Sequence, residues 1–191
     1  MADVRIFLAA VLVIVGCSAP ADTKHTGGER YNLGHAPDAA ALASIDIDVN
    51  PKGVGLPAGR GTASVGAALY AQKCAMCHGP RGEGIDKVPK LIGKEPGAGF
   101  SFAGDVKAVK TIGNYWPYAT TLFDYIRRTM PLSAPGTLTS DDTYSLVAFL
   151  LSENGIITPE MTIDAKSLPG VRMPAQSHFV KDDRTGGPGF R

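Results

Sequence analysis

The chain has 191 residues, and its 19 lysines and arginines against 18 aspartates and glutamates leave a formal net charge of +1. This length suits one domain with extensions at both ends. Nucleic-acid binding calls for clustered positive charge, and nothing in the sequence predicts such a partner. The three cysteines are Cys17, Cys74 and Cys77. Because the last two belong to one motif, no pair remains for a disulfide bond.

The chain begins with a segment typical of exported proteins. Residues 6–15 form an unbroken apolar run of ten residues, far short of the roughly 20 needed to cross a membrane. The run fits the apolar centre of a secretory signal peptide. Gly16-Cys17 follows directly and resembles the cleavage site of bacterial lipoproteins. We therefore predict a signal peptide over residues 1–16, a lipidated Cys17 and a membrane-anchored periplasmic protein. The alternative is an ordinary signal peptide cut beyond Cys17.

Residues 17–57 are predicted to be a tether and linker. They are polar up to about residue 50, rich in Ala, Gly, Asp and Pro, and follow no sustained period, which is typical of a linker. His25 and His35 lie in this segment, and we interpret them as solvated side chains rather than metal ligands.

The central motif is Cys74-Ala75-Met76-Cys77-His78, a C-x-x-C-H pattern that attaches c-type haem. Residues three apart share a helix face, so both thiols can add to the two vinyl groups along one haem edge. His78 can then supply the proximal imidazole. A thiol redox pair or half a zinc site would also use C-x-x-C. However, the sequence has neither a second ligand pair nor a βαβ pattern.

A helix is predicted to lead into this motif. Ser64 is a suitable N-cap, Leu69 and Tyr70 contribute an apolar face, and Gly79 ends the helix after the motif. Gly66 would permit close approach of another helix, although it can also be an ordinary helix glycine.

The segment from residue 80 to residue 117 is rich in glycine and proline and is predicted to wrap the haem as a loop, with room for one short helix. Pro89 and Leu91 stand just beyond His78 in the chain. A carbonyl here could accept the His78 Nδ1–H and make the ligand more electron-rich; a plain turn proline is the alternative. Trp116, the only tryptophan, is predicted at the haem edge, with core packing as its alternative role.

A second helix is predicted over residues 119–129. Leu122, Ile126 and Met130 recur every four residues and so share one face. A proline after Met130 ends the helix, which leaves a thioether at a helix end, well placed to be the sixth ligand of the iron. Met173 is also followed by proline and competes for this role.

A third helix is predicted to start at Thr139 or Ser140. Thr139 and Asp142 form a capping pattern, and the Asn154-Gly155 pair ends the helix. Residues 159–191 are predicted to be a C-terminal tail, whose position the sequence does not specify.

These features together resemble class I cytochrome c over residues 58–158. The resemblance implies an all-α fold with three main helices around one covalent haem c, and with extended N- and C-terminal tails. It implies that the first and last helices cross near Gly66, Tyr70 and Phe149. It also implies that Cys74 and Cys77 form thioethers with the haem. His78 would then be the proximal ligand and Met130 the distal ligand.

A narrower resemblance concerns three segments: GLPAGRGT at residues 55–62, IGNYWPYATTLFDYIRR at residues 112–128, and SLPGVRMP at residues 167–174. They are similar to the haem subunits of bacterial sulfite and sulfane dehydrogenases. In those proteins the haem takes electrons from a molybdenum-containing catalytic subunit, which is the partner that the resemblance implies. This chain has one haem motif where the sulfane subunit has two.

The residues therefore favour an electron-transfer protein that is not itself an enzyme. With both axial positions filled, the iron cannot readily bind a substrate, and thioether ligation favours reduced iron. The protein would pass single electrons from a periplasmic oxidoreductase to a respiratory acceptor. The alternatives are a free carrier to a terminal oxidase, a thiol oxidoreductase, and a haem enzyme or sensor with an open distal site. For an open site only His178, in the tail, is spare.

Overall fold

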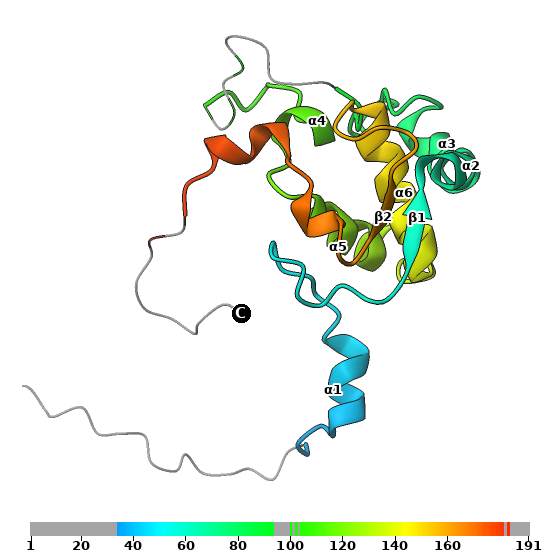
Figure 1. The fold of residues 1–191 in the computed structure, drawn as a ribbon, viewed down its shortest axis with the longest axis vertical. Helices are drawn as coiled ribbons and strands as arrows, with labels where there is room; N and C mark the ends of the chain where they lie inside the picture. Colours follow the sequence, from blue (N-terminus) through cyan, green and yellow to red (C-terminus); the bar gives the residue numbers. More distant parts are fainter. Residues whose placement is uncertain (1–33, 94–99, 101, 103, 182, 184–191) are drawn as a thin grey trace, which may run out of the picture. The chain divides into compact units, whose positions relative to one another are not determined.

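The computed structural model describes residues 34–93, 100, 102, 104–181 and 183 (Figure 1). The chain divides into two units, Met1–Leu42 and Ala43–Arg191. Helix α1 (Ala39–Ile45) spans this division and buries no residue. Among the described residues, no helix is both long and apolar enough to cross a membrane. The predicted signal peptide and Cys17 lie outside the described part.

Helix α2 (Ala63–Lys73) crosses helix α6 (Ser140–Glu153) at very short range. A Cβ atom at Gly66 would overlap the Ser145 carbonyl and lie 2.7 Å from Cβ of Phe149. One turn further along α2, the ring centroids of Tyr70 and Phe149 are 5.0 Å apart. The expected crossing near these residues is confirmed, and so is the role of Gly66 in it.

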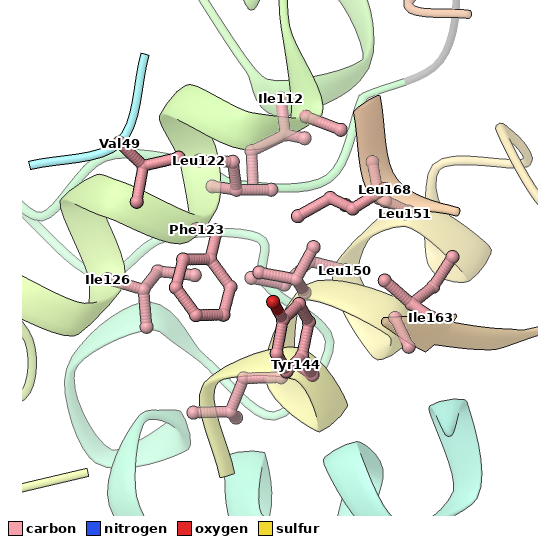
Figure 2. Packing of buried hydrophobic residues seen from close by; sticks show 14 of the residues in the cluster. Val49, Ile112, Leu122, Phe123, Ile126, Tyr144, Leu150, Leu151, Ile163 and Leu168 are labelled. Carbon is pink, nitrogen blue, oxygen red and sulfur yellow. The ribbon is translucent and has the colours of Figure 1, made fainter. Parts of the chain in front are cut away.

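Helix α5 (Ala119–Thr129) has the predicted bounds and packs against α6. Figure 2 shows the core between them, where the ring centroids of Phe123 and Tyr144 are 4.5 Å apart. The α6 start is also as predicted: the Thr139 hydroxyl accepts the Asp142 N–H, and an Asp142 carboxylate oxygen accepts the Thr139 N–H, both at 3.1 Å. The buried apolar residues shown there include Leu122, Phe123, Ile126, Tyr144, Leu150, Leu151, Ile163 and Leu168.

The predicted start of α2 is wrong by two positions. The helix begins at Ala63, and its N-cap is Thr62, in extended conformation, rather than Ser64. The reason is that strand β1 (Arg60–Thr62) runs directly into the helix, so the strand geometry decides where the helix can begin. The Ser64 hydroxyl lies 3.2 Å from that of Thr62.

The C-terminal segment folds back onto the helices. Strand β2 (Thr162–Asp164) pairs antiparallel with β1, and Gly61 stands opposite Ile163. Two short 3₁₀ helices follow, η1 (Leu168–Gly170) and η2 (Pro174–His178). This segment buries Ile163, Leu168 and Met173 in the common core. The described part is therefore mainly α-helical, as predicted, with one two-stranded sheet.

The end of the predicted linker is also anchored on this unit. The Val49 N–H donates to the buried Asp124 carboxylate at 2.9 Å, and the Tyr144 hydroxyl donates to the Pro57 carbonyl at 2.8 Å. Residues 49–57 therefore form a strap across α5 and α6.

The helix crossing leads to the first prediction. By helix propensity alone, Gly66→Ala should stabilise the protein by about 1 kcal/mol. Because the added Cβ would overlap the Ser145 carbonyl, we expect a net loss of about 2–4 kcal/mol instead. Chemical unfolding followed by circular dichroism measures this difference. Ala68→Ser, at an exposed position of the same helix, is the control and should change stability by less than about 0.5 kcal/mol. A stabilised Gly66→Ala variant would contradict the crossing.

Candidate haem-binding site

The C-x-x-C-H motif lies at the end of α2 and forms a turn of its own. Cys74 breaks the helix, with φ −123° and ψ −36°, and helix α3 (Ala75–His78) follows. The Cys74 carbonyl accepts the N–H groups of Cys77 at 3.1 Å and of His78 at 2.9 Å. The turn thus carries both thiols and the imidazole. Cys74 is half-buried against the core while Cys77 is exposed, and burial raises the pKa of the Cys74 thiol.

The predicted partner of the histidine is present. Nδ1 of His78 lies 3.1 Å from the Pro89 carbonyl oxygen. A carbonyl oxygen can only accept, so Nδ1 carries the hydrogen and donates it. This tautomer leaves a lone pair on Nε2, the arrangement needed for a metal ligand.

The loop that carries Pro89 is tied to the motif. The Gly84 N–H donates to the His78 carbonyl at 2.8 Å, and the Leu91 N–H donates to the Gly82 carbonyl at 2.8 Å. Leu91, a predicted pocket residue, is partly buried against the core. The main chain after the motif therefore returns to it and presents Pro89 to the imidazole.

Trp116 directly follows helix α4 (Ile112–Tyr115). It is also partly buried against the core, and its ring centroid lies 5.7 Å from that of Tyr125 in a T-shaped arrangement. Aromatic contact and partial exposure suit both of the roles that the sequence left open, at a haem edge or in the core.

The two candidate methionines differ in their surroundings. Met130 is the C-cap of α5, and its N–H donates to the Ile126 carbonyl at 3.0 Å. Its side chain is only partly buried. Met173 belongs to the core and is 4% exposed.

One residue in this region was missed by sequence reasoning. Asn154 was predicted only to end α6, yet it is 3% exposed and its side-chain oxygen accepts the Gly93 N–H at 2.9 Å. The Asn-Gly pair indicates a helix end, but no local signal indicates which distant loop the side chain contacts.

A hollow of about 700 Å³ borders the motif and is lined by Met76, Cys77, Ile85, Asp86, Lys87 and Val88. Within the part of the chain that the structure describes, no group of three or more His, Cys, Asp or Glu side chains could hold a metal ion. The motif supplies two thiols and one oriented imidazole on a single turn. This set fits a haem that is held covalently and ligated by one histidine.

Comparison with known proteins decides the family. The cytochrome c family model matches residues 63–154. The crystal structure of the sulfane dehydrogenase SoxCD from Paracoccus pantotrophus matches with a TM-score of 0.70 and 38% sequence identity, covering 81% of this chain and 74% of that chain. This chain belongs to the cytochrome c family. It is therefore a class I c-type cytochrome, an electron carrier with covalently bound haem c.

Other comparisons extend less far. A thiosulfate dehydrogenase, TsdBA from Marichromatium purpuratum, aligns with this cytochrome c at 28% identity and a TM-score of 0.33, covering 47% of this chain and 17% of that chain. No sequence among curated proteins matches this chain.

Tyr70 joins the haem motif of this cytochrome c to the helix crossing. Its buried hydroxyl donates to the Gly79 carbonyl at 2.9 Å, directly after the motif. Burial, with the nearby Cys74 and Glu83, raises the pKa of Tyr70 from 10.0 to about 12. Burial likewise raises the pKa of Tyr144 to about 12.

These raised pKa values predict a loss of stability at alkaline pH. Between pH 10 and 12 the unfolded chain loses the tyrosine protons while the folded protein keeps them. Each buried tyrosine should therefore cost on the order of 1 kcal/mol of unfolding free energy per pH unit in this window, and nothing below it. Tyr70→Phe should make the decline shallower in chemical unfolding at pH 9 to 12. Tyr125→Phe, at a 45% exposed position, should follow the wild type. An equal decline in all three proteins would contradict this prediction.

Proposed function

We propose that this cytochrome c is the haem subunit, or the immediate electron acceptor, of a periplasmic dehydrogenase that oxidises sulfite or sulfane sulfur. The supporting observation is the 38% identity to the sulfane dehydrogenase SoxCD across 81% of the chain. The matched length exceeds the family span of residues 63–154, so the likeness extends beyond the haem domain. The partner would be a molybdenum-containing subunit that carries out the sulfur chemistry.

In this proposal each motif residue has one role. Cys74 and Cys77 hold the haem through thioether bonds, and His78 is the proximal ligand through Nε2. The Pro89 carbonyl holds the imidazole in the required tautomer, at 3.1 Å from Nδ1. Leu91 and Trp116, both partly buried against the core, would line the haem pocket. When bound, the haem supplies reversible one-electron chemistry.

Met130 is proposed as the distal ligand. Its helix-end backbone is held by the Ile126 carbonyl, so little conformational entropy remains to be lost on ligation. Its side chain is only partly covered by protein, whereas Met173 is enclosed among core residues. A sulfur packed in the core is unsuited to face an iron. With His78 and Met130 as its protein ligands, the haem iron would have no free site for a substrate, which favours electron transfer over substrate chemistry.

Two methionine variants test the distal ligand. Met130→Ala should remove the methionine-to-ferric-iron charge-transfer band, lower the reduction potential and let carbon monoxide bind the reduced protein. Met173→Ala should keep the visible spectrum and lose about 2–4 kcal/mol of stability as a core truncation. Optical titration and chemical unfolding measure these effects. If Met173→Ala abolishes the band and Met130→Ala keeps it, the assignment is reversed.

The dehydrogenase role is tested by substrate-driven reduction. Affinity-tagged cytochrome is recovered from native membranes together with bound proteins, oxidised, and mixed with sulfite or thiosulfate. We expect the haem to be reduced rapidly, and we expect the recovered complex to contain molybdenum. Sulfate, which has no electrons to give, is the control and should leave the haem oxidised. If the haem-loaded cytochrome is recovered without a partner and is reduced by neither compound, the result would instead indicate a free carrier.

We further propose that Cys17 carries a lipid anchor. The apolar run of residues 6–15 and the Gly16-Cys17 junction support this, and the polar segment before residue 49 would serve as a tether. Stable anchoring takes more than one acyl chain. The resemblance to bacterial lipoproteins implies that Cys17 carries several.

Fractionation of cells tests the anchor. Wild-type protein should sediment with membranes, and Cys17→Ser should move to the soluble periplasmic fraction because it lacks the acceptor thiol. Ser18→Ala, the neighbouring change, should behave as wild type. A wild-type protein that is already soluble would contradict the anchor.

A further inference from the structure

Asn154 joins the last turn of α6 to a loop more than 60 residues away in the chain. The side chain is buried, with 3% exposed. Its oxygen accepts the Gly93 N–H at 2.9 Å. Its amide nitrogen donates to the Leu150 carbonyl at 2.7 Å and to the Leu91 carbonyl at 3.4 Å. One side chain thus contacts both backbone ends of the three-residue segment 91–93.

The same segment is held from the other side by the start of α4. The Thr111 hydroxyl donates to the Gly93 carbonyl at 2.8 Å, and the Ile112 N–H donates to the Leu91 carbonyl at 3.1 Å. A Cβ atom at Gly113 would lie 2.6 Å from the Asn154 side-chain oxygen. The segment is therefore enclosed between α4 and α6, and only a glycine at position 113 leaves room for this contact.

This segment is only two residues from the histidine's hydrogen-bond partner. Leu91 is bound at its carbonyl by Asn154 and at its N–H by the Gly82 carbonyl, at 2.8 Å. Pro89 precedes it and accepts the hydrogen bond of His78. Pro89 has no N–H of its own and makes no other hydrogen bond to the residues that the structure describes. Its placement therefore depends on Leu91 and on the chain leading to it.

We infer that Asn154 is a positioning residue for the proximal ligand: it fixes segment 91–93 and thereby aims the Pro89 carbonyl at Nδ1 of His78. The inference rests on the proposed role of His78. A well-aligned Nδ1–H···O bond makes the imidazole a stronger donor and favours ferric iron. Asn154 therefore lowers the reduction potential without contacting the haem ligand.

The first test compares Asn154→Ala with Thr143→Ala in the haem-loaded protein. Thr143 is a matched control because it is fully buried on the same helix and its hydroxyl donates to the carbonyl of Thr139, the N-cap of that helix, at 2.9 Å. Asn154→Ala should raise the reduction potential and speed solvent exchange of the His78 Nδ1 proton, seen by NMR, roughly tenfold. Thr143→Ala should change neither. The methionine charge-transfer band should persist in both variants, which separates the effect from loss of the distal ligand.

The outcomes distinguish this inference from the proposed function. A wild-type protein without covalent haem contradicts the haem roles themselves. A wild-type protein with haem, and an Asn154→Ala variant with unchanged potential and unchanged Nδ1 proton exchange, overturns only the role of Asn154. Equal shifts in Thr143→Ala and Asn154→Ala also overturn it, because they would reflect general destabilisation.

A second measurement needs no variant and applies if Asn154→Ala fails to fold. The Gly93 N–H donates to the Asn154 side chain, so in the wild-type protein its hydrogen exchange should be slowed at least as much as that of Gly84, which donates to the His78 carbonyl at 2.8 Å. Exchange of Gly93 at the rate of an unprotected amide would show that the contact does not hold the loop, and would overturn the inference.

Discussion

The structure depends on the contact between α2 and α6 at Gly66. Without a side chain there, the two helices approach until the Ser145 carbonyl and Phe149 fill the space beside the glycine. Helix α2 continues from this contact to Lys73, and the haem motif begins directly after it. The contact also orients α6, whose C-cap residue, Asn154, reaches the loop after the motif. The crossing of α2 and α6 therefore positions both the motif that carries His78 and the residue Asn154, which holds the loop after the motif.

Polar contacts carry this geometry from the helices to the ligand. Tyr70 binds the Gly79 carbonyl at one end of the motif, and Pro89 binds His78 from the loop. In the described residues, every buried polar side-chain atom has a hydrogen-bond partner. Such satisfied networks are rigid, and an electron carrier benefits because its ligand geometry has little freedom to change between redox states.

The segments outside the family span are part of the same core. Val49 from the strap, and Ile163 and Leu168 from the C-terminal segment, are buried with the residues of α5 and α6. The match to the sulfane dehydrogenase covers 81% of this chain, beyond the family span. Because that match is longer than the family span, it supports the proposed role in such a complex more than a match to the haem domain alone would.

The sequence by itself determined what depends on neighbours along the chain. The capping pair of Thr139 and Asp142 and the bounds of α5 follow from local hydrogen bonding and from a period of 3.6 residues, and both are confirmed. The contact between His78 and the Pro89 carbonyl, eleven residues further along the chain, could also be predicted from the local sequence. The lipidated Cys17 stays a prediction.

Only the tertiary structure decided the contacts between distant segments. Ser64 was the wrong cap because β1 pairs with a strand about 100 residues later, and that pairing sets where α2 begins. Asn154 ends α6 as predicted, but its contact with Gly93 could not be predicted because the two residues are 61 positions apart in the chain. A local pattern encodes the conformation that a residue prefers, but not the backbone group that folding will place beside it.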